Sequence, residues 1–371
     1  MKINSKNNSI TDELVKLTCD LISFKTTDDN PIEIDRCLEY IKDYFEYIPV
    51  IIKTIEHNNK KSLIISYEDK NNFKVLLNGH IDVVAAEPEQ FAPHIKNDKI
   101  YGRGASDMKG GVAVLMLLIK ELSQLDIKPD IALMIVSDEE IGGYDCSGYL
   151  ANQYSADLVI AAEPNRSKDP AGLDITIGHK GVLWLKVSTT GKSCHASRPW
   201  DGENAIEKLL NKYVEIKKII PEVKTESWLP TLNLGKIVAG NSINKVPDYA
   251  EMYLDIRFTE EPTSEVIINK IKEIKKINIE VLENSAMLFN NVTDNKAIEA
   301  VKTTAESILN RDVKFLKEHG ASDMRFFSEK NIPSIVFGPY GENLHGLDEN
   351  ISILSMQNYC EIMYKYLANL Y

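Results

Sequence analysis

The sequence predicts an α/β protein in which a largely parallel sheet is interrupted by a smaller α+β domain. The chain has 371 residues, which is more than one ordinary hydrophobic core accommodates, so two domains are expected. Strand and helix patterns alternate in the first half and again near the C-terminus, as in α/β folds. Between these stretches the order is β-α-β-β-α-β, which is typical of a small two-layer α+β unit.

The first half of the chain supplies the elements of the expected sheet. Apolar residues recur at helical spacing over 12–24 and 32–47, the second stretch beginning behind Pro31. The runs that follow predict strands at 50–55, 62–67 and 73–77, a helix over 111–122, and strands at 131–136 and 158–162. This alternation predicts a sheet covered by helices on both faces.

The pattern changes near Gly178 and changes back near residue 292. The intervening stretch predicts strands at 182–189, 231–238, 248–258 and 277–282, with helices over 203–219 and after Pro262. The α/β pattern then resumes with a strand at 334–337 and a helix over 354–370. We therefore expect one domain from residues 1–178 and 292–371 and an inserted domain of residues 179–291, with boundaries good to about four residues.

Composition argues against several classes of function. The chain is 43% apolar and 26% charged, as globular domains are. Lys+Arg number 43 and Asp+Glu 55, a net charge of −12 that repels nucleic-acid phosphates and anionic lipid. Residues 1–11 lack the apolar segment of a signal peptide, and no run of about 18 apolar residues occurs. The five cysteines are scattered, as reduced thiols are: Cys19, Cys37, Cys146, Cys194 and Cys360. We expect a cytoplasmic protein that binds neither nucleic acid nor membrane.

Candidate metal ligands follow the ends of the predicted strands, where an open α/β sheet places its site. They are His80, Asp82, Asp107, Glu139, Glu140, Glu163 and His345. Taken singly each has an ordinary explanation, since a histidine after a strand is usually structural and an Asp-Glu-Glu run is usually solvated. Together, two histidines and several carboxylates without cysteine suit Zn²⁺, Co²⁺ or Mn²⁺.

Spacing suggests how these residues divide the chemistry. The glycine-rich GRGASDMKGG lacks the GKS or GKT ending of a phosphate loop, and Asp107 would repel a phosphate, so nucleotide binding is not expected. Of the adjacent Glu139 and Glu140, one can bind metal while the other acts as general base. Asp82, two residues beyond His80 along an extended chain, faces the same side and can accept the other imidazole N–H.

The motifs GHIDVV, YGRGASDMKGG, SDEEIGG, AAEPN, CHAS, GASDMRF and HGLDE occur in this order. The series resembles the co-catalytic zinc aminoacylase and carboxypeptidase superfamily, which includes succinyl-diaminopimelate desuccinylase, acetylornithine deacetylase and glutamate carboxypeptidase. The resemblance covers nearly the whole chain. It implies two zinc ions, replaceable by Co²⁺ or Mn²⁺, in a catalytic domain with an inserted lid and dimerisation domain. His80 and Glu163 would hold one ion, Glu140 and His345 the other, and Asp107 would bridge them.

The resemblance also implies catalytic roles. Glu139 corresponds to the general base that activates a water shared by the two ions, and Asp82 to the partner of His80. The bond between Asp107 and Met108 should be a cis peptide.

The inserted domain contributes further residues by resemblance. His195 matches a lid histidine that reaches across a dimer to the oxygen of the scissile carbonyl, where an N–H donor stabilises the oxyanion. Asn244 and Arg257 match substrate-binding positions, and an arginine fork suits a substrate carboxylate. His195 could instead be a surface histidine and Arg257 could simply flank a strand.

Other residues of the pattern have weaker assignments. Ser322, Asp323 and Arg325 match a loop of the desuccinylase group, and Ser322 and Arg325 are taken as substrate-binding. The remaining histidines are expected to be structural: His57, His94, His179 and His319.

The expected activity is hydrolysis of the amide bond in a small N-acyl amino acid by a homodimeric enzyme. The leading hypothesis is removal of a succinyl or acetyl group from a diamino acid. A dipeptidase or carboxypeptidase using the same metals is the alternative. A non-catalytic binding protein on the same fold is a remote third hypothesis, because every ligand position and Glu139 are retained.

Overall fold

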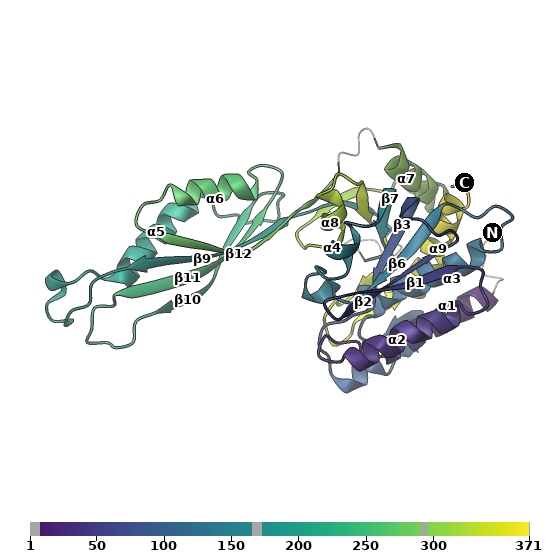
Figure 1. The fold of residues 1–371 in the computed structure, drawn as a ribbon, viewed down its shortest axis with the longest axis horizontal. Helices are drawn as coiled ribbons and strands as arrows, with labels where there is room; N and C mark the ends of the chain where they lie inside the picture. Colours follow the sequence, from purple (N-terminus) through teal and green to yellow (C-terminus); the bar gives the residue numbers. More distant parts are fainter. Residues whose placement is uncertain (1–7, 165–172, 291–294, 371) are drawn as a thin grey trace. The chain divides into compact units, whose positions relative to one another are not determined.

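The computed structural model describes residues 8–164, 173–290 and 295–370. The chain divides into two units (Figure 1). The first unit contains Met1–Gly178, Asn290–Leu316 and Ser322–Tyr371, and the second contains His179–Phe289 and Lys317–Ala321. The chain therefore enters the second unit twice, the second time for five residues only.

A mixed sheet forms the frame of the first unit. Its strands follow the spatial order β1 (Ile51–His57), β2 (Lys60–Ser66), β6 (Ile131–Val136), β3 (Asn72–His80), β7 (Ser155–Ala161), β15 (Ser334–Val336) and β8 (Ile175–His179). The central strands β6, β3, β7 and β15 are parallel, whereas β1, β2 and β8 pair antiparallel. Strands β13 (Leu288–Phe289) and β14 (Phe315–Glu318) extend the same sheet where the chain passes between the units. The predicted α/β fold with a mostly parallel sheet is confirmed.

Helices pack against this sheet. They are α1 (Asn8–Ser23), α2 (Pro31–Tyr44), α3 (Gly110–Leu122), α4 (Ser147–Leu150), α7 (Lys296–Leu309), α8 (Met324–Ser328) and α9 (Ile353–Leu367). Helix α3 is the innermost, since every residue from Val112 to Ile119 is 0% exposed. A helix that is apolar on all sides must be buried, and the sequence VAVLMLLI meets this condition. Among the described residues, no helix is long and apolar enough to cross a membrane.

A second, small sheet in the first unit was not predicted. It has the order β16 (Gly341–Glu342), β17 (Asn350–Ser352), β5 (Lys99–Tyr101) and β4 (His94–Lys96). Strands of two or three residues are too short to show an alternating pattern. Antiparallel pairing of Asn350 with Tyr101 joins two segments that lie far apart in the sequence. Those segments lead directly to Asp107 and His345.

The second unit is a separate antiparallel sheet with two helices on one face (Figure 1). Its strands follow the order β10 (Thr231–Ala239), β11 (Tyr249–Phe258), β9 (Gly181–Thr190) and β12 (Asn278–Ser285), and its helices are α5 (Ala205–Ile219) and α6 (Ser264–Lys272). Residues on β11 alternate strictly, with Ala250, Met252 and Leu254 buried and Tyr253 on the partly exposed face. Asn204 and Thr263 cap the helices by accepting hydrogen bonds from backbone N–H groups. The predicted inserted α+β fold is confirmed.

Two glycines allow the end of β7 to pack tightly between neighbouring segments. A Cβ atom on Gly111, in α3, would lie 2.3 Å from the carbonyl oxygen of Ala162. A Cβ atom on Gly338 would lie 2.2 Å from the same oxygen. Both distances are far below van der Waals contact, so only glycine fits at these positions. Glu163, the next residue, is thereby held between α3 and the segment after β15.

Substituting Gly111 by alanine should destabilise the first unit. Alanine normally stabilises a helix relative to glycine by about 1 kcal/mol, but here the added methyl group meets an immobile backbone carbonyl. We expect the free energy of unfolding to fall by roughly 1–3 kcal/mol, as in overpacked cores, when unfolding is followed by circular dichroism in urea. Gly320→Ala is the control, because nothing lies within 4 Å of its added Cβ. A stabilised Gly111→Ala chain would contradict this account of the packing.

Candidate metal centre

His80 lies at the end of β3, and one of its imidazole nitrogens makes a hydrogen bond to the backbone. It is 1% exposed. Its Nδ1 donates a hydrogen bond to the backbone carbonyl of Asp82 over 3.0 Å, and the Asp82 carboxylate oxygen Oδ1 lies 3.5 Å from the same nitrogen. The carbonyl is thus the nearer of the two Asp82 groups. A neutral His80 with its proton on Nδ1 directs the lone pair of Nε2 toward Asp107, where a cation would bind.

The carboxylate of Asp107 lies between the two histidines. Asp107 lies in the kinked segment Ala105–Lys109, between β5 and α3, and its φ of −120° and ψ of 92° are not helical. Its Oδ1 is 3.0 Å from Nε2 of His80, and its Oδ2 is 3.2 Å from Nε2 of His345. A carboxylate with its two oxygens facing two different imidazoles has the arrangement of a bridging ligand. The expected cis peptide between Asp107 and Met108 is present.

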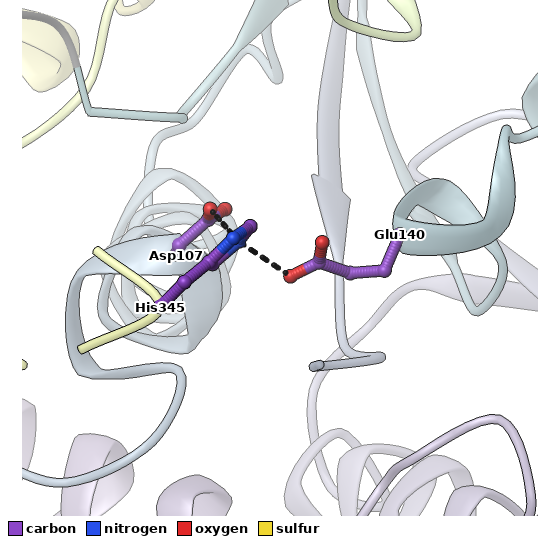
Figure 2. A group of neighbouring side chains, drawn as sticks. All are labelled: Asp107, Glu140 and His345. Atoms are coloured by element: carbon purple, nitrogen blue, oxygen red, sulfur yellow. Dashed lines mark ion pairs between the residues drawn. The ribbon is translucent and has the colours of Figure 1, made fainter. Parts of the chain in front are cut away.

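Glu140 completes a compact group with Asp107 and His345 (Figure 2). It lies in the 3₁₀ turn Glu139–Ile141 that follows β6, and its backbone N–H donates to Oδ2 of Asp82 over 2.9 Å. Oε1 of Glu140 is 3.3 Å from Nε2 of His345. One ligand atom from each of the three residues lies within 4.8 Å of the others. Three predicted ligands from distant parts of the chain therefore meet at one point.

Glu163 is close to this group without belonging to it. It follows β7, and it is not among the residues whose ligand atoms meet within 4.8 Å. Its Oε1 is buried and has no hydrogen-bond partner in the described part of the chain. The structure thus brings His80 next to Asp107 but does not draw Glu163 into a group with them.

Charges in the centre shift the histidines and Asp107 in opposite directions. Burial disfavours a charged His80, but hydrogen bonds with Asp107 and Asp82 raise its pKa well above the usual value. Hydrogen bonds with Asp107 and Glu140 raise the pKa of His345 to about 10. Burial alone would raise the pKa of Asp107, but hydrogen bonds from His345 and His80 lower it below its ordinary range. The carboxylates therefore attract positive charge to this point.

The remaining glutamates are shifted toward the protonated form. Burial raises the pKa of Glu163 to about 8, with His80 opposing this shift and Asp107 and Asp323 adding to it. Burial and the charge of Glu163 raise the pKa of Glu139 well above its usual value. Carboxylates crowded in this way repel one another unless a cation or protons neutralise them.

The residues fit divalent cations. Among the described residues, Oε1 of Glu163 is buried without a hydrogen-bond partner, and the buried Oε1 of Glu140 and Oδ1 of Asp82 face only the imidazoles of His345 and His80, at 3.3 Å and 3.5 Å. A buried polar atom without a partner is costly, so these oxygens need a counter-charge. Imidazole and carboxylate donors without thiolate suit Zn²⁺, Co²⁺ or Mn²⁺.

Arg325 is engaged inside the protein. It is 6% exposed, and its guanidinium donates to the carbonyl oxygens of Gly142 over 2.6 Å and of Ser322 over 3.1 Å. Gly142 immediately follows the turn that carries Glu139 and Glu140. Ser322 is also buried, at 0% exposure. Their predicted role as substrate ligands stays a prediction, and the contacts seen here hold the Glu140 loop.

In the second unit, His195 and Asn244 lie side by side. An isolated β-bridge pairs His195 with Lys245, and the N–H of Ala196 donates to the Asn244 carbonyl over 3.0 Å. The backbone N–H of Ser197 donates to Nδ1 of His195 over 3.2 Å. Both predicted residues are exposed.

Arg257 lies elsewhere on the same unit, on the partly exposed face of β11. Its guanidinium donates to both carboxylate oxygens of Asp255, over 2.9 Å and 3.1 Å. To bind a substrate carboxylate as predicted, the Arg257 guanidinium would have to release Asp255 or contact both carboxylates.

Two residues of the centre were missed as participants. Arg103 and Glu349 stand in the quoted motifs YGRG and HGLDE, yet no role was assigned to either. Arg103 is 3% exposed and Glu349 is 1% exposed. Arg103 is a charged residue between two glycines, and this is the sequence feature that could have indicated a buried ion pair.

Comparisons with known proteins identify the family and the fold. The model of a family described as peptidase family M20/M25/M40 matches residues 76–369. An uncharacterised metallohydrolase of Methanocaldococcus jannaschii is 31% identical over 362 residues, covering 86% of this chain and 83% of the relative. A probable succinyl-diaminopimelate desuccinylase of Staphylococcus aureus is 27% identical, covering 91% and 93%. The crystal structure of an aminopeptidase from Bacillus cereus superposes with a TM-score of 0.78 at 18% identity, covering 97% of this chain and 98% of that one.

Metal binding should separate the two adjacent glutamates. Glu140→Ala removes a carboxylate that lies 3.3 Å from His345, so its affinity for Zn²⁺ or Co²⁺ should fall by more than about 100-fold, beyond the usual cost of losing an outer partner. Glu139→Ala should bind metal as the unaltered chain does, because its carboxylate makes no ion pair or hydrogen bond with the described residues. Equilibrium dialysis with metal analysis measures both. The reverse order of affinities would mean that the base and the ligand are exchanged.

Proposed function

Because this chain belongs to peptidase family M20/M25/M40, whose relatives include metallohydrolases, we propose that it hydrolyses the amide bond of a small N-acyl amino acid. The leading activity is removal of a succinyl or acetyl group from a diamino acid. The observation that carries the proposal is the carboxylate of Asp107 between His80 and His345, 3.0 Å and 3.2 Å from their Nε2 atoms. Glu139 lies in the same turn as Glu140, and its carboxylate makes no ion pair or hydrogen bond with the described residues.

Two Zn²⁺ ions are the proposed cofactors. His80 and Glu163 would hold the first ion, Glu140 and His345 the second, and Asp107 would bridge them. When bound, such ions polarise the scissile carbonyl and make water more acidic. Asp82 contacts one proposed ligand of each ion. Its carbonyl accepts a hydrogen bond from His80, and its carboxylate accepts one from the backbone N–H of Glu140.

Glu139 is the proposed general base and acid. Its carboxylate takes a proton from the attacking water as the oxygen adds to the amide carbon. It then returns this proton to the leaving amine as the C–N bond breaks. The turn is fixed by a hydrogen bond from the N–H of Gly142 to the carbonyl of Glu139 over 2.9 Å, which leaves the side chain free for proton transfer.

His195 is the proposed donor to the oxyanion. The Ser197 N–H donates to Nδ1 of His195, so a neutral imidazole carries its proton on Nε2. An exposed Nε2–H is the group required to stabilise the negative oxygen of a tetrahedral intermediate.

The separation of His195 from Arg257 favours a homodimer. Arg257 pairs with Val182 at one end of β9, whereas Tyr249 pairs with Thr190 at the other end, five residues before His195. Eight residues of extended strand span about 27 Å. A small N-acyl amino acid cannot reach both side chains on one lid, so a substrate that contacts both must meet lids of two chains.

A dipeptidase or carboxypeptidase activity is the second candidate. The fold similarity to an aminopeptidase favours it, and the same residues would cleave a peptide bond. A binding protein without activity is the third candidate, disfavoured because the metal-binding group is assembled and Glu139 is in place.

A substrate panel tests the proposed function. The metal-stripped chain should be inactive, and Zn²⁺ or Co²⁺ should restore activity at about two ions per chain. The panel contains N-succinyl-diaminopimelate, N-acetylornithine, N-acetyl-lysine and several dipeptides. We expect the highest kcat/KM on one of the N-acyl diamino acids, because a Staphylococcus aureus relative is named as a probable succinyl-diaminopimelate desuccinylase and a Rickettsia bellii relative as a succinyl-diaminopimelate desuccinylase. Activity that survives exhaustive chelation would sink the metal mechanism, and faster cleavage of dipeptides would select the second candidate.

Mixing inactive variants tests the role of His195. His195→Ala should lower turnover by roughly 10²–10³, the usual cost of one oxyanion donor. Mixed with an inactive Glu139→Ala chain, it should regain activity, because one site of a mixed dimer combines an intact Glu139 with the partner's intact histidine. Each variant incubated alone is the control. A fully active monomer in dilute solution would refute the arrangement across chains.

A further inference from the structure

A buried ion pair lies directly behind the ligands Asp107 and His345. Nη1 of Arg103 donates to Oε2 of Glu349, and the two side chains are 3% and 0% exposed. Arg103 comes four residues before Asp107, and Glu349 comes four residues after His345. Pairing of β5 with β17 brings the two segments together, with Tyr101 opposite Asn350.

Each member of the pair holds the backbone of one ligand. Oε1 of Glu349 accepts hydrogen bonds from the N–H groups of Ser106 and Asp107, over 3.0 Å and 3.1 Å. Nη2 of Arg103 donates to the carbonyl of His345 over 3.0 Å and to that of Gly346 over 3.3 Å.

These contacts form a closed ring. It runs from the backbone of Asp107 through Glu349 and Arg103 to the backbone of His345, and the 3.2 Å approach of His345 Nε2 to Asp107 Oδ2 closes it. Charge-assisted hydrogen bonds are short and strong, and an arginine fork fixes direction as well as distance. The ring therefore limits the distance between the two ligands.

His345 depends on such support. It is a non-glycine residue in the left-handed region, with φ of 60°, a conformation that such residues rarely adopt without compensation. Its side chain is 49% exposed, so packing alone restrains it little. Hydrogen bonds to its own carbonyl and to that of Gly346 hold this turn in place, and Nε2 of Gln90 adds a third by donating to Gly346 over 2.9 Å.

We propose that the Arg103–Glu349 pair is a positioning device that presets the separation of Asp107 and His345 for the cation that they bind with Glu140. Neither side chain touches the reacting atoms. Stability alone gives little reason to keep such a pair, because desolvation offsets most of the attraction between two buried charges. Ligand geometry does give a reason to keep the pair, since residues that orient metal ligands contribute strongly to the affinity for the metal. The inference rests on the metal site of the proposed function.

Conservative variants of the pair test this inference through metal binding. Glu349→Gln keeps an oxygen that can accept from the N–H groups of Ser106 and Asp107, but it replaces the charged partner of Arg103 by a neutral amide. Arg103→Lys keeps the charge but replaces the fork by one point of contact, and it is the milder variant should Glu349→Gln fold poorly. Both should bind Co²⁺ about 10–100-fold more weakly in calorimetry. Their Co²⁺ absorption spectra should also change, since the ligand geometry changes.

The chain offers a matched control pair in Arg311 and Asp174. Oδ1 of Asp174 accepts from Nη1 of Arg311 over 2.9 Å and from the N–H of Lys314 over 3.0 Å, so this pair also holds a backbone group, but not the backbone of a predicted metal ligand. Arg311→Lys and Asp174→Asn should lose stability while keeping the affinity and the spectrum of Co²⁺. Urea unfolding of the metal-free chains measures the stability of all four variants.

The outcomes separate this inference from the proposed function. Wild-type affinity and spectrum in both Arg103→Lys and Glu349→Gln would overturn the positioning role while leaving the metal site intact. Equal losses of affinity in the control variants would also overturn it, because the effect would then follow stability. If the unaltered chain bound no Co²⁺, the metal site of the proposed function would itself be wrong, and the positioning role with it.

Discussion

The structure of the candidate site depends on the crowding of carboxylates around two imidazoles. Asp107 lies 3.0 Å from His80 and 3.2 Å from His345, and Glu349 and Arg103 hold the backbones of Asp107 and His345 by hydrogen bonds. Burial and mutual repulsion raise the pKa of Glu163 to about 8, so this arrangement is costly without a counter-charge. The rest of the first unit can be understood as the scaffold that maintains this crowding and leaves a place for cations.

The scaffold acts through three different kinds of contact. Parallel pairing of β3 with β6 and β7 brings His80 and the segments leading to Glu140 and Glu163 to one edge of the sheet. The small sheet joins the Asp107 and His345 segments, and the buried pair of Arg103 and Glu349 connects their backbones. Glycine at positions 111 and 338 lets neighbouring segments close on the end of β7. Each contact restrains backbone, so the ligand side chains are placed by main-chain geometry more than by their own packing.

The second unit presents a separate set of polar side chains. Its sheet leaves one face without a helix, and the exposed residues His195 and Asn244 lie beyond one end of β9 while Arg257 lies at the other. Polar side chains presented at both ends of one rigid sheet suit a lid that serves two sites. This division motivates the proposal that hydrolysis needs both the metal centre and a second copy of the chain.

The sequence by itself determined the fold class, the inserted domain and the set of candidate ligands. Apolar periodicity identifies long elements such as α3 and β11, and seven motifs in a fixed order are specific even though each is ordinary alone. Other features were decided only by the tertiary structure, because they are contacts between segments far apart in the chain. Strands of two or three residues, such as β5 and β17, have no readable period, so the pairing that sets Arg103 against Glu349 could not be predicted. Likewise, whether Arg325 donates to Gly142 or points elsewhere depends on which backbone carbonyl lies within reach after folding, and residue type alone does not encode that distance.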